Sequence, residues 1–158
     1  MTTPTAYIET TVVGHLVGRI VADPIVAGRQ AVTRQWWPFA VNKYRLIVSK
    51  LVADECSMGD PQAAKERLDV LDSLEFVATS TLVDDLARKL MLYHAVPKTE
   101  PRDAVHISLA AVNGIEYLVS WNFTHIVNPT TRTAIERVCR DAGYVPPLIC
   151  TPDELMEA

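Results

Sequence analysis

The chain has 158 residues, of which 49% are hydrophobic and 22% are charged, a composition typical of a globular protein large enough to bury a core. Its formal net charge of −4 excludes a uniformly basic surface, so contact with a nucleic acid would require a local basic patch or a metal ion in an acidic pocket. No stretch reaches the ~18 apolar residues that span a bilayer, and the first residues lack the features of a signal peptide. We therefore expect one cytoplasmic domain over residues 1–158, with no membrane contact.

Strand-like and helix-like segments alternate along the first half of the chain. In chain order we expect a strand over 6–9, a helix over 10–20, a turn over 23–28, a helix over 30–42, a strand over 46–49, a helix that contains Glu55 and a helix over 61–73. Thr10 or Thr11 is the expected N-cap of the first helix, because a hydroxyl can accept from the free backbone N–H groups. Asp60 followed by Pro61 is a stronger helix-start signal.

The second half continues the alternation. We expect a strand over 74–78, a helix over 82–94, a helix over 101–113, a strand over 117–120, a helix over 128–143, a strand over 148–150 and a helical turn that starts at Thr151 and Pro152. Gly143 is the expected left-handed cap of its helix. Alternating strands and helices imply parallel pairing through right-handed crossovers, and the continuous apolar strands imply cover on both faces. The prediction is a three-layer α/β/α sandwich around a mainly parallel sheet of four to five strands.

Acidic and amide side chains fall where the expected strands end or the next helices begin. Glu9 ends the first strand, Glu55 lies in the helix after the second strand, Asp103 opens a helix and Asn122 follows the fourth strand. In an open parallel sheet the carboxyl ends of the strands share one edge, so these side chains are expected to converge there. Carboxylate and amide oxygens are preferred ligands of Mg²⁺ and Mn²⁺, and such ions promote phosphodiester hydrolysis. The pattern predicts a metal site.

Each residue also has a structural explanation. Asp103 at a helix start is favoured by the helix dipole, Glu55 fits a solvated helix surface, and Asn122 fits a turn. Glu9 is harder to explain in this way, because a buried acid is costly without partners. His106 and His125 either orient a carboxylate or phosphate, or are hydrogen-bonded structural residues.

Other residues remain open to two interpretations. Cys56, Cys139 and Cys150 show no metal-ligand spacing and are expected to be reduced packing residues. The neighbouring Trp36 and Trp37 fit a core or a partner surface, with base stacking as the alternative. Five arginines are candidates for phosphate contacts or for ordinary solvated surface: Arg19, Arg29, Arg34, Arg102 and Arg132.

Four segments of the chain resemble the PIN-domain family. They are Tyr-Ile-Glu-Thr-Thr at 7–11, the stretch from Ser49 through Glu55 to Gly-Asp-Pro at 59–61, Asp-Ala-Val-His-Ile at 103–107, and Trp-Asn-Phe-Thr-His at 121–125. The likeness is to bacterial VapC-type proteins, the toxins of type II toxin–antitoxin systems, and it spans nearly the whole chain. It implies a PIN-like fold, a Mg²⁺- or Mn²⁺-dependent endoribonuclease activity on RNA, a protein antitoxin as partner, and a homodimer.

The resemblance also implies roles for individual residues. Glu9, Glu55 and Asp103 match the three acids of the family, and Asn122 matches a fourth position that is often Asp. Thr10 or Thr11 matches the hydroxyl residue after the first acid. Glu9 replaces the commoner Asp and is one methylene longer, and Asn122 removes one negative charge. Glu100, one turn before Asp103, is a candidate to supply that charge.

These departures motivate an alternative of another class, a catalytically weak or inactive PIN-like module that binds RNA or a protein. A small phosphatase or nucleotide-binding domain is a third reading of the same fold class. The chain lacks both GxxxxGK[ST] and a GxGxxG after a strand, so the sequence does not favour that third reading.

Overall fold

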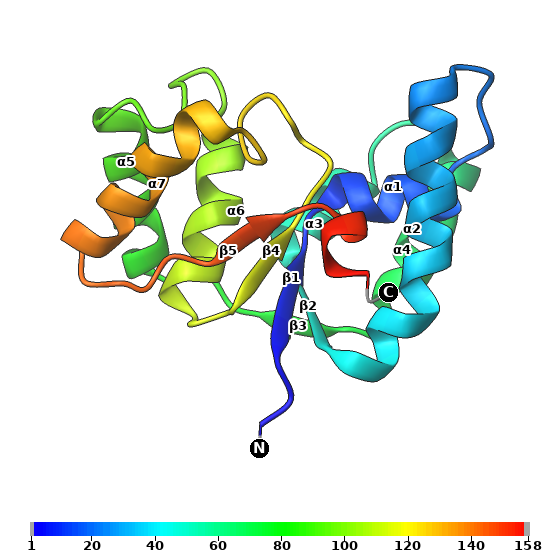
Figure 1. Ribbon diagram of the computed structural model, residues 1–158, viewed down its shortest axis with the longest axis horizontal. Coiled ribbons are helices and arrows are strands. Elements are labelled where there is room, and N and C mark those ends of the chain that lie inside the picture. Colours follow the sequence, from blue (N-terminus) through cyan, green and yellow to red (C-terminus); the bar gives the residue numbers. More distant parts are fainter. Residues whose placement is uncertain (1, 157–158) are drawn as a thin grey trace.

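The centre of the molecule is a five-stranded sheet in which all neighbouring strands are parallel, as seen in a computed structural model that describes residues 2–156 (Figure 1). The strands are β1 (Thr5–Ile8), β2 (Arg45–Ser49), β3 (Glu75–Val77), β4 (Tyr117–Val119) and β5 (Leu148–Cys150). Their order across the sheet is β3-β2-β1-β4-β5. This arrangement confirms the predicted α/β fold class, with pairing that is parallel throughout.

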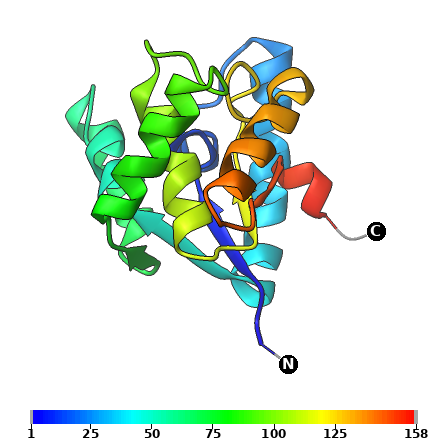
Figure 2. The same ribbon diagram turned by 90° about the vertical axis from the view of Figure 1, so that its left-hand side faces the viewer.

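Helices cover both faces of the sheet. Within the described residues they are α1 (Thr10–Val17), α2 (Pro24–Lys43), α3 (Lys50–Cys56), α4 (Pro61–Leu71), α5 (Thr81–Leu92), α6 (Pro101–Val112), α7 (Pro129–Asp141) and the short 3-10 helix η1 (Pro152–Leu155). α1 packs against α2, α3 and α4, whereas α5 packs against α6 and α7. Figures 1 and 2 show these two groups on opposite sides of the sheet, which gives the three layers. None of the helices in residues 2–156 has the length and hydropathy of a membrane span.

The order of the strands creates a switch point between β1 and β4. The chain first moves outward from β1 to β2 and β3, and then crosses back to place β4 on the other side of β1. Ile8 of β1 pairs with Val119 of β4, so the two strands end at the same level. The chain departs from the two strand ends toward different faces, and this is the usual ligand position in such sheets. Glu9 and Ser120, the next residues, are therefore neighbours.

The central strands are buried on both sides, which explains their lack of polar alternation. Tyr7 and Ile8 of β1 and Leu118 and Val119 of β4 are fully buried. Trp36 is also fully buried and Trp37 packs beside it, so this pair belongs to the core.

The three cysteines are free and buried, as the sequence predicted. Burial raises the pKa of each thiol, to about 11 for Cys56 and Cys139 and about 12 for Cys150, so all three stay protonated at neutral pH.

The predicted start of the second helix was wrong. We expected a turn over 23–28 and a helix from Gln30, but α2 begins at Pro24 and contains Gly28. The Asp23 carboxylate accepts from the backbone N–H groups of Ile25 and Val26 at 2.9 and 3.1 Å. Asp23 and Pro24 thus form the same cap and first-turn pair as Asp60 and Pro61, and a single helical glycine costs too little to stop the helix.

Replacing each of two glycines by alanine tests the left-handed conformation of Gly143 and the helical conformation of Gly28. Gly143 has φ of +93°, and a Cβ there would meet nothing within 4 Å, so Gly143→Ala carries only the backbone cost and should lower the unfolding free energy by about 1 kcal/mol. Gly28 is helical and equally uncrowded, so Gly28→Ala should raise it by about 0.5–1 kcal/mol. Urea unfolding of both variants measures the two changes. Shifts of the same sign would contradict these backbone assignments.

Candidate active site

Glu9 lies at the switch point as the N-cap of α1, and its carboxylate is almost fully buried at 4% exposure. One carboxylate oxygen, Oε2, accepts from the Thr11 backbone N–H at 3.2 Å. The other, Oε1, accepts from the hydroxyls of Thr11 at 2.5 Å and Ser120 at 2.6 Å. The buried charge therefore has the partners that its burial requires. The prediction of Thr10 or Thr11 as the N-cap was wrong. The N-cap is Glu9, whose side chain accepts from the Thr11 backbone N–H.

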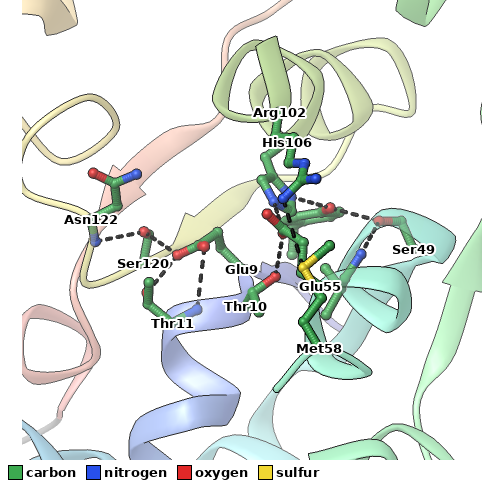
Figure 3. A network of polar contacts seen from close by, with 12 residues as sticks. Glu9, Thr10, Thr11, Ser49, Glu55, Met58, Arg102, His106, Ser120 and Asn122 are labelled. Carbon is green, nitrogen blue, oxygen red and sulfur yellow. Dashed lines mark hydrogen bonds and ion pairs between the residues drawn. The ribbon is translucent and has the colours of Figure 1, made fainter. Parts of the chain in front are cut away.

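The two hydroxyls that donate to Glu9 are themselves held by backbone N–H groups. Thr11 Oγ1 accepts from the Trp121 N–H and Ser120 Oγ accepts from the Asn122 N–H, each at 2.9 Å. Figure 3 shows Ser120 between Asn122 and Glu9. The polarised N–H groups after β4 thus strengthen the donors that face Glu9, and they fix the path of the chain after this strand.

Glu55 approaches the same place from α3. Its Oε1 accepts from the Thr10 hydroxyl and pairs with His106 Nε2, both at 2.6 Å (Figure 3). The adjacent residues Thr10 and Thr11 therefore serve two different acids. Burial favours a higher pKa for Glu55, but His106, Thr10 and the Arg102 charge together lower its pKa below the usual value, so Glu55 is ionised at neutral pH.

A buried chain of hydrogen bonds orients His106. The Tyr7 hydroxyl lies 2.7 Å from His106 Nδ1 and 2.8 Å from Ser49 Oγ, and Ser49 Oγ accepts from the Val52 N–H at 3.3 Å. Burial raises the pKa of Tyr7 far above its usual value, so the phenol keeps its proton. All these groups are satisfied if Ser49 donates to Tyr7, Tyr7 donates to Nδ1, and His106 Nε2–H donates to Glu55. In this arrangement His106 Nε2 faces the Glu55 carboxylate.

Asp103 lies in the first turn of α6 and has partners from the segment after β4. Its Oδ2 lies 3.0 Å from His125 Nδ1, and the Asn122 side chain also hydrogen-bonds to it. The Asn122 carbonyl accepts from the His125 N–H at 3.1 Å, which leaves the amide NH₂ to face the acid. Burial raises the pKa of Asp103 above its usual value of 3.8, although Asn122 and His125 oppose that rise.

The predicted residues converge as two groups. In the first group, ligand atoms of Glu9, Glu55 and His106 lie within 4.8 Å of one another, and the second group contains Glu100, Asp103 and His125 within the same limit. Asp103 and His106 are one turn apart on α6, so this helix links the two groups. Asn122 is a second link, through Ser120 on one side and Asp103 on the other.

The chemistry of each group suits a divalent cation. Each places two carboxylates beside an imidazole in a partly dehydrated position, and carboxylate oxygens are ligands that Mg²⁺ and Mn²⁺ favour. A cation there would also offset the repulsion between acids that are held close together.

Sequence reasoning did not single out Ser120 or Tyr7. Ser120 had a usable signal, because it is a hydroxyl at the carboxyl end of a predicted central strand, next to Trp121 and Asn122. Tyr7 had none, since its hydroxyl meets Ser49 and His106 only through strand pairing and helix packing.

The sequence was compared with models of protein families and with curated proteins, and neither comparison found a match. The function must therefore be inferred from the side chains of the chain itself.

Removing the Tyr7 hydroxyl tests the buried chain. Tyr7→Phe should lower the unfolding free energy by about 1–3 kcal/mol, because buried His106 Nδ1 would lose its donor and the Ser49 O–H would lose its acceptor. Tyr93→Phe is the control, since Tyr93 is 63% exposed. Denaturant unfolding measures both, and equal stability of the two variants would contradict the network.

Asp103→Asn should stabilise the metal-free protein at neutral pH. Since the pKa of Asp103 is raised above 3.8, the folded state holds this proton more tightly than the unfolded chain, and stability falls as the pH rises through the folded-state value. The gain from the substitution should thus be present at about pH 7 and shrink toward about pH 4. Urea unfolding in EDTA at the two pH values checks this, and a loss of stability at both would contradict it.

Proposed function

We propose that this chain is a Mg²⁺- or Mn²⁺-dependent endoribonuclease of PIN type, and the toxin of a type II toxin–antitoxin system. The observation that supports the chemistry is the meeting of Glu9, Glu55 and His106 within 4.8 Å at the switch point of a parallel sheet. Glu9 and Glu55 are 46 positions apart in the sequence, so no local turn or cap requires them to meet.

The residues present fit a divalent cation. Glu9 and Glu55 would hold it with His106 beside them, and Asp103 with Glu100 and His125 offers a second position. When bound, the ion polarises the phosphoryl oxygens and lowers the pKa of water. The protein side chains fix the acids: Thr10 and Thr11 hold Glu55 and Glu9, whereas Asn122 and His125 hold Asp103.

The two departures from the family pattern have a structural context. The longer side chain of Glu9 also caps α1, so this acid combines a helix cap with a candidate ligand position. Asn122 directs its NH₂ toward Asp103, and Glu100 lies in the same group. These contacts support Glu100 as the source of the charge that Asn122 lacks.

The antitoxin, the homodimer and the assignment as a toxin are proposed from the motif resemblance, whereas the cytoplasmic location is proposed from the composition of the sequence. The motifs that carry the resemblance at 7–11, 49–61, 103–107 and 121–125 include every acid of the first group and Asp103 of the second.

One observation favours the non-catalytic alternative, a PIN-like module that binds RNA or a protein. Both oxygens of Glu9 accept hydrogen bonds from its own chain, so a structural role alone would account for this acid. Calorimetry with MnCl₂ distinguishes the two functions, because the nuclease requires binding at millimolar concentration or below and the inert module does not.

Glu55→Gln tests the nuclease directly. The substitution keeps the length of the side chain but removes its charge, so Mn²⁺-dependent cleavage of a single-stranded RNA should fall at least about 100-fold. The rate of product formation on a denaturing gel measures the loss.

Asp54→Asn is the matched control for Glu55→Gln. Asp54 is the preceding residue on α3, but it is exposed and pairs with Lys50 at the surface. This variant should cleave at the wild-type rate. If Glu55→Gln folds and cleaves as fast as Asp54→Asn, the proposed active site is wrong.

A further inference from the structure

An arginine and two aromatic side chains form a cluster beside the candidate active site. The segment that holds Glu9 through Ser120 continues directly into Trp121, Asn122 and Phe123. Figure 3 shows Asn122 next to Ser120, and Phe123 is the following residue. Phe123 keeps 42% of its surface exposed, although it is a large apolar side chain. An exposed aromatic ring therefore lies three residues beyond a direct contact of the buried acid.

Arg29 of α2 covers this aromatic pair. Its guanidinium carbon lies 4.7 Å from the centre of the Phe123 ring and 5.9 Å from that of Trp121. Within residues 2–156 the guanidinium forms no hydrogen bond and no ion pair. Its five N–H donors are thus available to an outside acceptor, while the rings hold the charge in place.

Trp121 makes the cluster rigid. Its indole Nε1 donates to Thr33 Oγ1 at 2.8 Å, and the Thr33 hydroxyl donates to the backbone carbonyl of Arg29 at 2.6 Å. The opposite neighbour of Trp121 is His15, whose ring stacks at 6.0 Å. Trp121 is buried, so it backs the cluster, whereas Phe123 and Arg29 form its outer part.

We propose that Phe123 and Arg29 form a nucleotide subsite, in which an unpaired base stacks on the face of Phe123 that Arg29 does not cover and the guanidinium of Arg29 contacts the adjoining phosphate. An exposed ring suits a base, because every base has a π-face, and a guanidinium without an acid partner suits a phosphate. Single-stranded nucleic acid presents an unpaired base face and a phosphate in each nucleotide, whereas a paired duplex hides its base faces. Charge complementarity supports the same ligand, since the Arg29 guanidinium is positive and a phosphate is negative.

The inference rests on the proposed function, because the subsite is placed to hold a nucleotide next to the bond that the acids would act on. It adds two residues that lie outside the acidic groups and that determine which part of the substrate is bound. Binding in EDTA, where cleavage is blocked, tests the subsite apart from the chemistry.

The test measures binding of a fluorescein-labelled single-stranded RNA by anisotropy in EDTA. Phe123→Ala should weaken binding about 5- to 150-fold, the usual effect of losing one base–aromatic stack. Phe123→Trp should restore it, because indole also stacks. An oligonucleotide of the same length without bases should bind Phe123→Ala and wild type equally.

Arg29→Gln should weaken binding and make the salt dependence less steep, by about 0.7 in the slope of log K against log salt.

Matched controls are available on other elements of the fold. Phe76 of β3 is 54% exposed, and Arg88 of α5 is an exposed arginine paired with Asp85. Phe76→Ala and Arg88→Gln should bind RNA as wild type does. If Phe123→Ala binds like Phe76→Ala, the subsite is wrong even where the wild-type protein cleaves RNA.

The cleavage assay separates this inference from the proposed nuclease. If the wild-type protein binds RNA through Phe123 but does not cleave it with Mn²⁺, the subsite stands and the nuclease assignment is overturned. If it neither binds nor cleaves RNA, both are overturned.

Discussion

Burial of the Glu9 carboxylate, between two strands that end at the same level, puts a charge where water cannot solvate it. The surrounding chain compensates with three donors, one from the backbone and two from hydroxyls. These donors come from the first turn of α1 and from the residue after β4, so the same bonds that stabilise the charge also set the directions in which the chain leaves the sheet. The switch point and the acid are therefore one structural unit.

Two adjacent threonines then determine how the acids are separated. Thr11 donates to Glu9 and Thr10 donates to Glu55, so the first turn of α1 holds each carboxylate by a short hydrogen bond. Behind Glu55, the chain from Ser49 through Tyr7 to His106 presents one imidazole N–H to the acid. Such a site is held in place before any ligand arrives, which is a general requirement for binding and catalysis.

Asp103 differs from the other acids in how its charge is stabilised. Its partners Asn122 and His125 only partly offset its burial, and its pKa is raised, whereas the pKa of Glu55 is lowered by stronger partners. A carboxylate that is destabilised in the free protein gains the most from a cation or another positively charged ligand. The Asp103 charge is thus unfavourable to the metal-free fold, whereas Glu9 stabilises α1 as its N-cap.

The sequence alone determined the fold class and most element boundaries, because these depend on neighbouring residues: the apolar runs, the Asp60–Pro61 start of α4 and the left-handed Gly143 each act over a few positions. It also placed Glu9 at the end of a strand, Asn122 after one, Glu55 in the helix after β2 and Asp103 at the start of a helix. Tertiary structure decided what local signals cannot carry. Ser120 donates to a residue 111 positions earlier, and Trp121 to one 110 positions earlier, and only the strand order brings them there. In the folded chain Glu9, not a threonine, caps α1, and Asp103 lies in a separate group from Glu9 and Glu55.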